Sequence, residues 1–276
     1  VNCHDKANGK TKAKEKVVHV WAVANQKGGV GKTTTTVSMA GLLREQGYKV
    51  LMVDLDPHGS LTSYFQYDPD DIEFSTFDLF MHEGRVPDKL PKQIIRKTGK
   101  EGIDLFPAST ALATLERKVA GQGGMGLVIS KSLAKLWDQY QYVLIDTPPI
   151  LGVLMINALA AAERLLIPVQ TEFLAVKGLE RMTHTLDMVM QSTKKQLPFT
   201  ILPTLYDRRT HASLNALKKI RELYGDQVFE EAIPVDTKFR DASAIAKMPS
   251  DLDPNGRGVR VYRHLLSSLL KTTSAA

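Results

Sequence analysis

The sequence predicts an α/β fold with a single doubly wound, mostly parallel β-sheet flanked by helices. Two observations lead to this prediction. Short apolar runs rich in β-branched residues, typical of fully buried strands, recur along the chain, and segments with helical spacing of apolar residues separate them. This alternation favours parallel strands joined by helical crossovers that cover both faces of the sheet. We expect residues 17–271 to form one domain and residues 1–16 to form a tail.

Composition indicates an ordinary globular protein. The 276 residues are 43% hydrophobic and 24% charged, which is enough apolar material for a sizeable core. The single cysteine, Cys3, excludes a disulfide framework, a cysteine-based metal site and an iron–sulfur cluster. No apolar stretch has the length of a membrane span, and the N-terminus lacks a signal-peptide pattern. We therefore expect a cytoplasmic protein with no integral membrane association.

The first 16 residues contain five lysines, two acidic residues and few apolar side chains, so we expect a flexible basic tail. Such a tail could attach weakly to nucleic acid or anionic lipid. It could equally be a solubilising extension, and we favour this second interpretation because short mixed-charge tails are common.

A glycine-rich loop lies between a strand predicted at residues 17–24 and a helix predicted at residues 37–46. Gly28, Gly29 and Gly31 allow successive backbone N–H groups to face one anion, and the helix N-terminus adds partial positive charge. Strand, glycine-rich loop, Gly-Lys-Thr and helix together form the context of a phosphate-binding loop. A plain glycine turn capped by threonines is the alternative, and the complete strand–helix context disfavours it.

The residue types in this loop predict ATP and Mg²⁺ as ligands. Lys32 would reach the β- and γ-phosphates, and the Thr33 hydroxyl would ligate Mg²⁺. Thr34 is placed to donate to the α-phosphate. The backbone of the loop, including Val30 with its neighbouring glycines, would complete the phosphate contacts.

One departure from the ordinary loop is informative. Gln26 stands where the ordinary motif has glycine, and a second lysine, Lys27, precedes Gly28. The loop Lys-Gly-Gly-Val-Gly-Lys-Thr resembles the deviant Walker A loop of the ParA/MinD ATPases, which are P-loop NTPases. The resemblance implies a homodimer that sandwiches two ATP molecules, in which Lys27 reaches the nucleotide of the opposite subunit.

A second motif follows the next predicted strand. Asp54 and Asp56 stand at the strand end in Asp-Leu-Asp-Pro-His-Gly, where ligands of parallel sheets bind. This stretch is similar to Asp-x-Asp-Pro-Gln-Gly of ParA-type ATPases. The resemblance implies that Asp56 positions the attacking water and that Asp54 supports the Mg²⁺ shell. His58 replaces the usual glutamine, so its role stays open.

A third motif ends the apolar run at residues 142–146. The terminal Asp146 has the position of a Walker B carboxylate, which holds a Mg²⁺-bound water. The following Thr-Pro-Pro resembles the family's switch II, and its prolines prevent continuation of the strand. Lys27, Lys32 and Asp56 are thus the predicted catalytic residues, and Thr33, Asp54 and Asp146 are the predicted metal ligands.

Apolar patterns place the remaining elements. Helical pieces are predicted at residues 62–66, 74–82, 127–137 and 179–190, and strands at 102–107, 164–170, 199–207 and 229–236. Residues 121–126 are predicted to be a glycine-rich surface loop. The basic amphipathic helix near the C-terminus is expected to close the fold rather than to bind membrane as a MinD targeting helix does. Pro234 and Asp236 resemble the Pro-x-Asp segment that contacts adenine in MinD-like members.

DNA binding is left open by the sequence. The basic residues used by Soj-like chromosomal ParA proteins fall on Arg209 and Lys238 here. Val235 stands where Soj-like proteins have another arginine, so this loop is less basic. Clustered basic residues could contact phosphates without reading bases, but an exposed basic helix face is usually only solvated.

Residues 56–65 and 173–182 are similar to one subgroup, the ParA-like proteins encoded beside chemotaxis genes. That resemblance implies a slow, partner-stimulated ATPase that positions chemotaxis arrays, with a cargo adaptor or polar landmark protein and array proteins as partners. It would concentrate at the cell pole or on the nucleoid. The alternatives are a chromosome or plasmid partition ATPase, a MinD-like division-site regulator, an amide-forming synthetase and an ATP-binding scaffold without hydrolysis.

Overall fold

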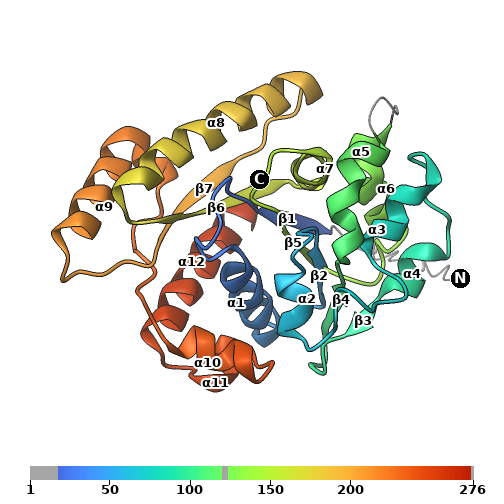
Figure 1. The fold of residues 1–276 in the computed structure, drawn as a ribbon. Coiled ribbons are helices and arrows are strands. Elements are labelled where there is room, and N and C mark those ends of the chain that lie inside the picture. The colour runs from blue at the N-terminus through green and yellow to red at the C-terminus, as the bar shows by residue number, and fades with distance from the viewer. Residues whose placement is uncertain (1–17, 120–123, 275–276) are drawn as a thin grey trace, which may run out of the picture.

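The computed structural model describes residues 18–119 and 124–274, and they build one seven-stranded sheet (Figure 1). The strand order is β3-β4-β2-β5-β1-β6-β7, and every pairing is parallel except the antiparallel pair β3–β4. The predicted fold class is therefore confirmed. The predicted tail (residues 1–16) and residues 121–123 of the predicted surface loop at 121–126 lie outside the described residues.

The strands are short and, apart from β3, lie near their predicted positions. Their bounds are β1 (His19–Val23), β2 (Val50–Asp54), β3 (Arg96–Lys97), β4 (Ile103–Phe106), β5 (Tyr142–Asp146), β6 (Arg164–Gln170) and β7 (Phe199–Thr204).

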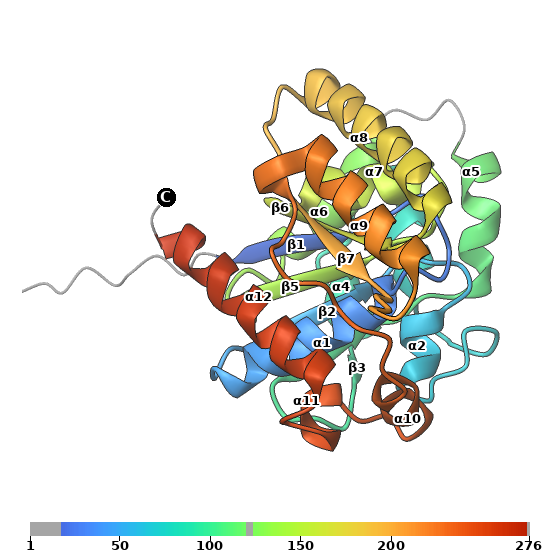
Figure 2. The same cartoon turned by 90° about the vertical axis from the view of Figure 1, so that its left-hand side faces the viewer.

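Helices cover both faces of the sheet (Figures 1 and 2). One face carries α3 (Thr76–Leu79), α4 (Leu90–Ile94), α5 (Leu115–Lys118), α6 (Val128–Ala134), α7 (Val153–Ala161), α8 (Phe173–Thr193) and α9 (His211–Tyr224). The other carries α1 (Lys32–Glu45), α2 (Ser60–Tyr64), α10 (Lys238–Ala244), α11 (Pro249–Leu252) and α12 (Arg257–Ser274). Short 3₁₀ turns are η1 (Phe80–His82), η2 (Thr110–Thr114), η3 (Met125–Leu127) and η4 (Gly225–Gln227).

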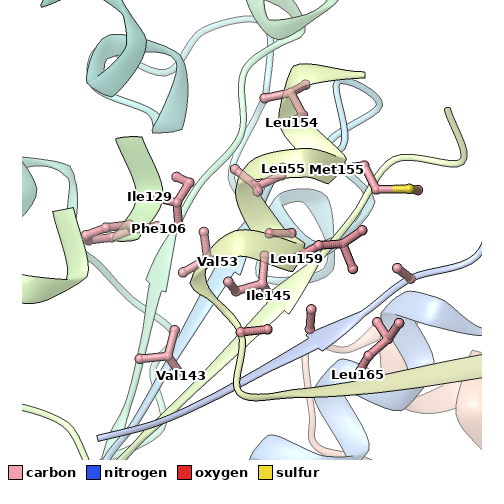
Figure 3. Packing of buried hydrophobic residues seen from close by; sticks show 14 of the residues in the cluster. Val53, Leu55, Phe106, Ile129, Val143, Ile145, Leu154, Met155, Leu159 and Leu165 are labelled. Atoms are coloured by element: carbon pink, nitrogen blue, oxygen red, sulfur yellow. The ribbon is translucent and has the colours of Figure 1, made fainter. Parts of the chain in front are cut away.

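Each central strand contributes to two separate hydrophobic clusters because successive side chains point to opposite faces. In β5, Val143 and Ile145 belong to the cluster under α6 and α7, whereas Tyr142 and Leu144 belong to the cluster under α1 and α12. Figure 3 shows Val143 and Ile145 packed in the first cluster with residues of α6 and α7. Burial on both faces explains why these strands are apolar throughout.

The C-terminal helix α12 lies beside α1, as Figure 2 shows. Its apolar side chains Val259, Tyr262 and Leu266 are buried in the same cluster as the core of α1. Among the described residues, no helix combines the length and apolar content that crossing a bilayer requires. The apolar face of α12 is therefore used within the fold, as the sequence led us to expect.

The prediction of a strand at residues 229–236 was wrong. The chain there makes only isolated bridges, Ile201 with Val228 and Tyr206 with Pro234, and then continues as a loop. Phe229 and Ile233 are buried in the cluster under α12, and their backbone N–H groups donate to Ile201 and Pro203 of β7 at 2.9 and 2.8 Å. These contacts are local and do not extend into a strand. The sequence patterns also missed α7 and the short antiparallel strand β3.

The topology brings the carboxyl ends of three strands together on one side of the sheet. β1 lies between β5 and β6, and β2 lies on the other side of β5. Asp54 at the end of β2 is in register with Asp146 at the end of β5. The connection from β1 to α1 also leaves the sheet at these carboxyl ends, which is where ligands of open parallel sheets bind.

Candidate nucleotide-binding site

The loop between β1 and α1 has the backbone that its glycines predict. Gly29 has φ of 73° and Gly31 has φ of 92°, a left-handed region that favours glycine. Gly31 is the N-cap of α1, and this N-cap makes no side-chain capping hydrogen bond. The helix begins at Lys32, earlier than its predicted start at residue 37. The N–H groups of the first helical turn therefore remain available to an anion.

Two hydrogen bonds from neighbouring strands hold this loop in place. The Asn25 Nδ2 group donates to the carbonyl oxygen of Pro168 in β6 at 2.7 Å. The Thr204 hydroxyl at the end of β7 donates to the carbonyl oxygen of Val30 at 2.8 Å. These contacts with β6 and β7 therefore hold the loop in place before a ligand binds.

Lys32 is buried under the loop, with only 7% of its surface exposed. Its ammonium donates to the carbonyl oxygen of Lys27 at 3.2 Å. Burial lowers the pKa of Lys32, and the carboxylates of Asp146 and Asp56 oppose that shift. A buried ammonium with one neutral hydrogen-bond acceptor leaves donors available for an anionic ligand.

Asp146, at the end of β5, contacts the first turn of α1. The Thr33 hydroxyl donates to Asp146 Oδ2 at 2.6 Å, so the two predicted metal ligands are in contact. Within the described part of the chain, the buried Oδ1 of Asp146 has no hydrogen-bond partner. Burial, and secondarily the charge of Asp54, raises the pKa of Asp146. A partnerless buried carboxylate oxygen beside a threonine hydroxyl suits a hard cation such as Mg²⁺.

Asp54 has a different environment from Asp146. Its Oδ2 accepts from the Thr62 backbone N–H at 2.8 Å and from the Thr62 hydroxyl at 2.7 Å. Its Oδ1 accepts from the Asp56 backbone N–H at 3.0 Å. Both oxygens are thus occupied by the chain itself, and Asp54 anchors α2 to the end of β2. Burial nevertheless raises the pKa of Asp54 to about 6.

Asp56 follows two residues later and is partly exposed, with 14% of its side chain accessible. Its Oδ1 accepts from the backbone N–H of His58 at 3.0 Å and lies 2.9 Å from the His58 ring Nδ1. The substituted His58 therefore contacts the carboxylate that was predicted to position water. Gly59, with φ of 59°, ends the turn, and a Cβ there would lie 2.3 Å from the Pro69 side chain.

A cavity of about 150 Å³ opens beside the loop, between β7 and α12. It is lined by Gly31 and Thr34 of the phosphate loop and by the predicted adenine contacts Pro234 and Asp236. Side chains that the sequence patterns did not reveal also line it: Thr204, Phe239, Arg240 and Tyr262. The structure thus brings the two halves of the predicted nucleotide site to one cavity.

Lys27 lies at the rim of the loop and points toward α8. Its ammonium forms an ion pair with Glu172 and lies 3.5 Å from Gln170 Oε1. Unlike Lys32, it is partly exposed, with 32% of its side chain accessible. The sequence patterns did not indicate Glu172 as a partner, because 145 residues separate it from Lys27.

The predicted DNA contacts both have acidic partners in the structure. Arg209 donates twice to Asp207, at 2.9 and 2.8 Å, and Lys238 lies 3.5 Å from Asp241. Arg209 also lines a groove of about 490 Å³ together with Arg208 and Arg257. Lys238 is not among the residues that line this groove.

We predict that Asp146→Asn stabilises the nucleotide-free protein increasingly as pH rises from about 4 to 7. An acid with a raised pKa holds its proton more tightly in the folded state, so ionisation between the unfolded and folded pKa values lowers the free energy of unfolding. Asparagine keeps an acceptor for Thr33 and cannot ionise. Urea unfolding at each pH should show an advantage of at least about 1 kcal/mol at pH 7.

The control for this measurement is Asp70→Asn, at an exposed position. Its stability should follow that of the parent at every pH. An Asp146→Asn protein whose advantage does not grow with pH would contradict the buried-charge account.

Comparisons with known proteins agree with this geometry. The family described as "AAA domain" matches residues 18–199. The chain is 34% identical to the sporulation initiation inhibitor protein Soj of Bacillus subtilis, over 88% of this chain and 95% of that protein. It is 31% identical to the chromosome partitioning protein ParA of Myxococcus xanthus, over 92% of this chain and 89% of that protein.

A solved structure also matches nearly the whole chain. Cobyrinic acid a,c-diamide synthase from Mycobacterium smegmatis, with bound ATP analogue and magnesium, has a TM-score of 0.80 and 36% identity over 94% of this chain and 96% of that chain. The family match, the two relatives and the shared fold lead to one conclusion: the chain belongs to the ParA and Soj family of P-loop ATPases.

Proposed function

We propose that this protein is a Mg²⁺-dependent ATPase that dimerises around two ATP molecules and acts as a spatial switch for cellular cargo. The observation that supports this most is that the two lysines of the loop have different environments. Lys32 is buried beneath the loop, whereas Lys27 is directed outward to the start of α8. A lysine at the rim of the loop is placed to exchange Glu172 for a nucleotide in a second subunit, as the deviant loop predicts.

The residues that would hold the nucleotide have separate tasks. The loop N–H groups and Lys32 bind the triphosphate, Thr33 and Asp146 bind the cation, and the cavity at Pro234 and Asp236 takes the nucleoside. Magnesium, when bound, neutralises charge that develops on the phosphates. Asp54 lies in register with Asp146 and would support the cation site by its charge, while Thr62 holds its carboxylate in place.

Asp56 would orient the water that attacks the γ-phosphate. It is the accessible carboxylate of the pair at the end of β2, and its pairing with His58 fixes the side chain near the mouth of the site. Lys32 and Lys27 would stabilise the charge that develops during in-line attack. Hydrolysis removes the contact that joins the subunits, so the dimer separates.

One cargo candidate is a chemotaxis array at the cell pole, on the similarity of residues 56–65 and 173–182 to that subgroup. A second candidate is partition of chromosomes or plasmids through DNA, because the relatives include Soj and ParA. The groove with three arginines supports that candidate, since phosphate contacts need clustered cations and no base recognition.

An amide-forming synthetase is a rival from another class, since a solved structure 36% identical to this chain has that description. The two functions share the ATP site and differ in the acceptor of the phosphoryl group. Phosphate release without any added small carboxylate substrate would favour the switch. Release only in the presence of such a substrate would favour the synthetase.

A fluorescent fusion should separate the two cargo candidates. Array positioning predicts foci at one pole that become bipolar before division, with no change in Arg209→Glu. DNA partition predicts decoration of the nucleoid that Arg209→Glu and Lys238→Glu abolish, together with salt-sensitive DNA binding in vitro. Diffuse fluorescence under all conditions would contradict both assignments.

We predict that Lys27→Ala weakens the dimer formed with a slowly hydrolysed ATP analogue by at least about 5-fold. Each subunit would lose a hydrogen bond to a charged phosphate, worth about 1.5–3 kcal/mol, less about 0.2–1 kcal/mol for the ion pair that the monomer keeps, and the dimer contains two such contacts. Sedimentation velocity measures the change. Lys177→Ala, at an exposed position of α8, is the matched control. Parent-like dimers of Lys27→Ala would remove the cross-subunit contact from the mechanism.

Asp56→Ala is expected to slow phosphate release by about 100-fold or more, because it removes the group that orients the attacking water. Binding of ATP should persist, so the variant should accumulate as an ATP-bound dimer. Asp70→Ala, at an exposed position in the connection that follows α2, should retain parent turnover. Equal phosphate release by Asp56→Ala and the parent would exclude this role for Asp56.

A further inference from the structure

Lys27 has an acidic partner in the single subunit. Its ammonium pairs with Glu172 and lies near Gln170, both on the connection between β6 and α8. The pair is only partly accessible, with 32% of the Lys27 side chain and 37% of the Glu172 side chain exposed. The lysine that would reach a second subunit therefore already has a partner.

Glu172 is held in an unusual way for its position. It is the N-cap residue of the 21-residue helix α8, yet its side chain makes no capping hydrogen bond. Its backbone is fixed, because its N–H donates to Gln170 O at 2.9 Å and its carbonyl oxygen accepts from Ala175 N at 3.1 Å. A carboxylate at a helix N-terminus normally benefits from the helix N–H groups. Here it is directed to Lys27 instead.

The surface beside this ion pair is apolar and uncovered. Phe173 and Leu174 follow Glu172 directly, and 80% and 66% of their surfaces are exposed. A second subunit that approaches Lys27 closely enough to present its nucleotide would also meet these two side chains. Their burial would favour association.

We propose that Glu172 is a positioning residue that retains Lys27 in its own subunit until the nucleotide of a second subunit displaces it. The proposal rests on the dimer function proposed above. ATP phosphates carry more charge than one carboxylate, so they can compete for the ammonium where a neutral surface cannot. Glu172 thereby raises the threshold for dimerisation and opposes association in the absence of nucleotide. Release also frees its carboxylate at the start of α8.

The first test compares Glu172→Gln with the parent in the presence of a slowly hydrolysed ATP analogue. A partly exposed ion pair changes an equilibrium roughly 1.5- to 5-fold, and a dimer must break two of them. The dimer dissociation constant measured by sedimentation velocity should therefore fall roughly 2- to 25-fold. Glu180→Gln, farther along α8 and exposed, should leave it unchanged, and Glu172→Asp should lie nearer the parent.

The second test measures Lys27 itself in the nucleotide-free protein. Loss of the ion pair with residue 172 should release the Lys27 amine and make it more accessible to the reagent. Mass spectrometry after brief acylation should thus show faster modification of Lys27 in Glu172→Gln, with Lys177 as the internal reference. An unchanged Lys27 acylation rate, or an unchanged dimer dissociation constant, would overturn the proposal.

The two proposals fail in different ways. If Lys27→Ala weakens the dimer while Glu172→Gln behaves as the parent in both measurements, the retaining contact is wrong and the cross-subunit function stands. If Lys27→Ala dimerises as the parent does, the function proposed for Lys27 is wrong. Faster Lys27 acylation in Glu172→Gln would then report a contact without a role in dimerisation, which also overturns the inference.

Discussion

Burial of a lysine and an aspartate beneath the phosphate loop is the constraint on which the site depends. Lys32 and Asp146 lose water without gaining full sets of partners in the protein, and the Asp146 Oδ1 atom has none among the described residues. Such groups cost free energy unless charges or hydrogen bonds compensate them. The fold tolerates this cost because the carboxyl ends of the strands and the left-handed glycines of the loop fix the positions of Lys32 and Asp146. An anionic phosphate and a divalent cation would satisfy both groups at once.

The same constraint separates the two carboxylates at the end of β2. Strand periodicity directs Asp54 into the protein, where Thr62 and the Asp56 backbone occupy both of its oxygens. Asp56 stands beyond the strand, at the more accessible mouth of the site. A motif of two aspartates therefore contains one structural and one accessible group. This geometry favours Asp146 over Asp54 as the carboxylate that meets the cation directly.

Local sequence patterns predicted the fold and the phosphate-binding side of the site. They could do so because, in a parallel sheet, residues that directly follow neighbouring strands lie close together. Each of the first three motifs follows a strand, so the strand ends bring Lys32, Asp54 and Asp146 together without any knowledge of side-chain contacts. The nucleoside side was less predictable. Tyr262 reaches the site from α12 and contacts Thr35 across 227 residues at 2.8 Å, and no local spacing encodes that contact. The false strand at residues 229–236 has the same origin, since burial under α12 imitates a strand pattern.

The proposed switch would respond to the difference in ligand-binding free energy between monomer and dimer, not to the strength of binding in either state. A ligand with equal contacts in monomer and dimer cannot shift the equilibrium, however tightly it binds. Lys27 is already paired with Glu172 in the single subunit, so only the excess of a phosphate contact over that ion pair can favour the dimer. Because the pair is partly exposed, breaking it costs little, so in the proposed dimer a modest phosphate contact would be enough to displace Glu172. The retained lysine therefore suits a reversible switch better than a free lysine would.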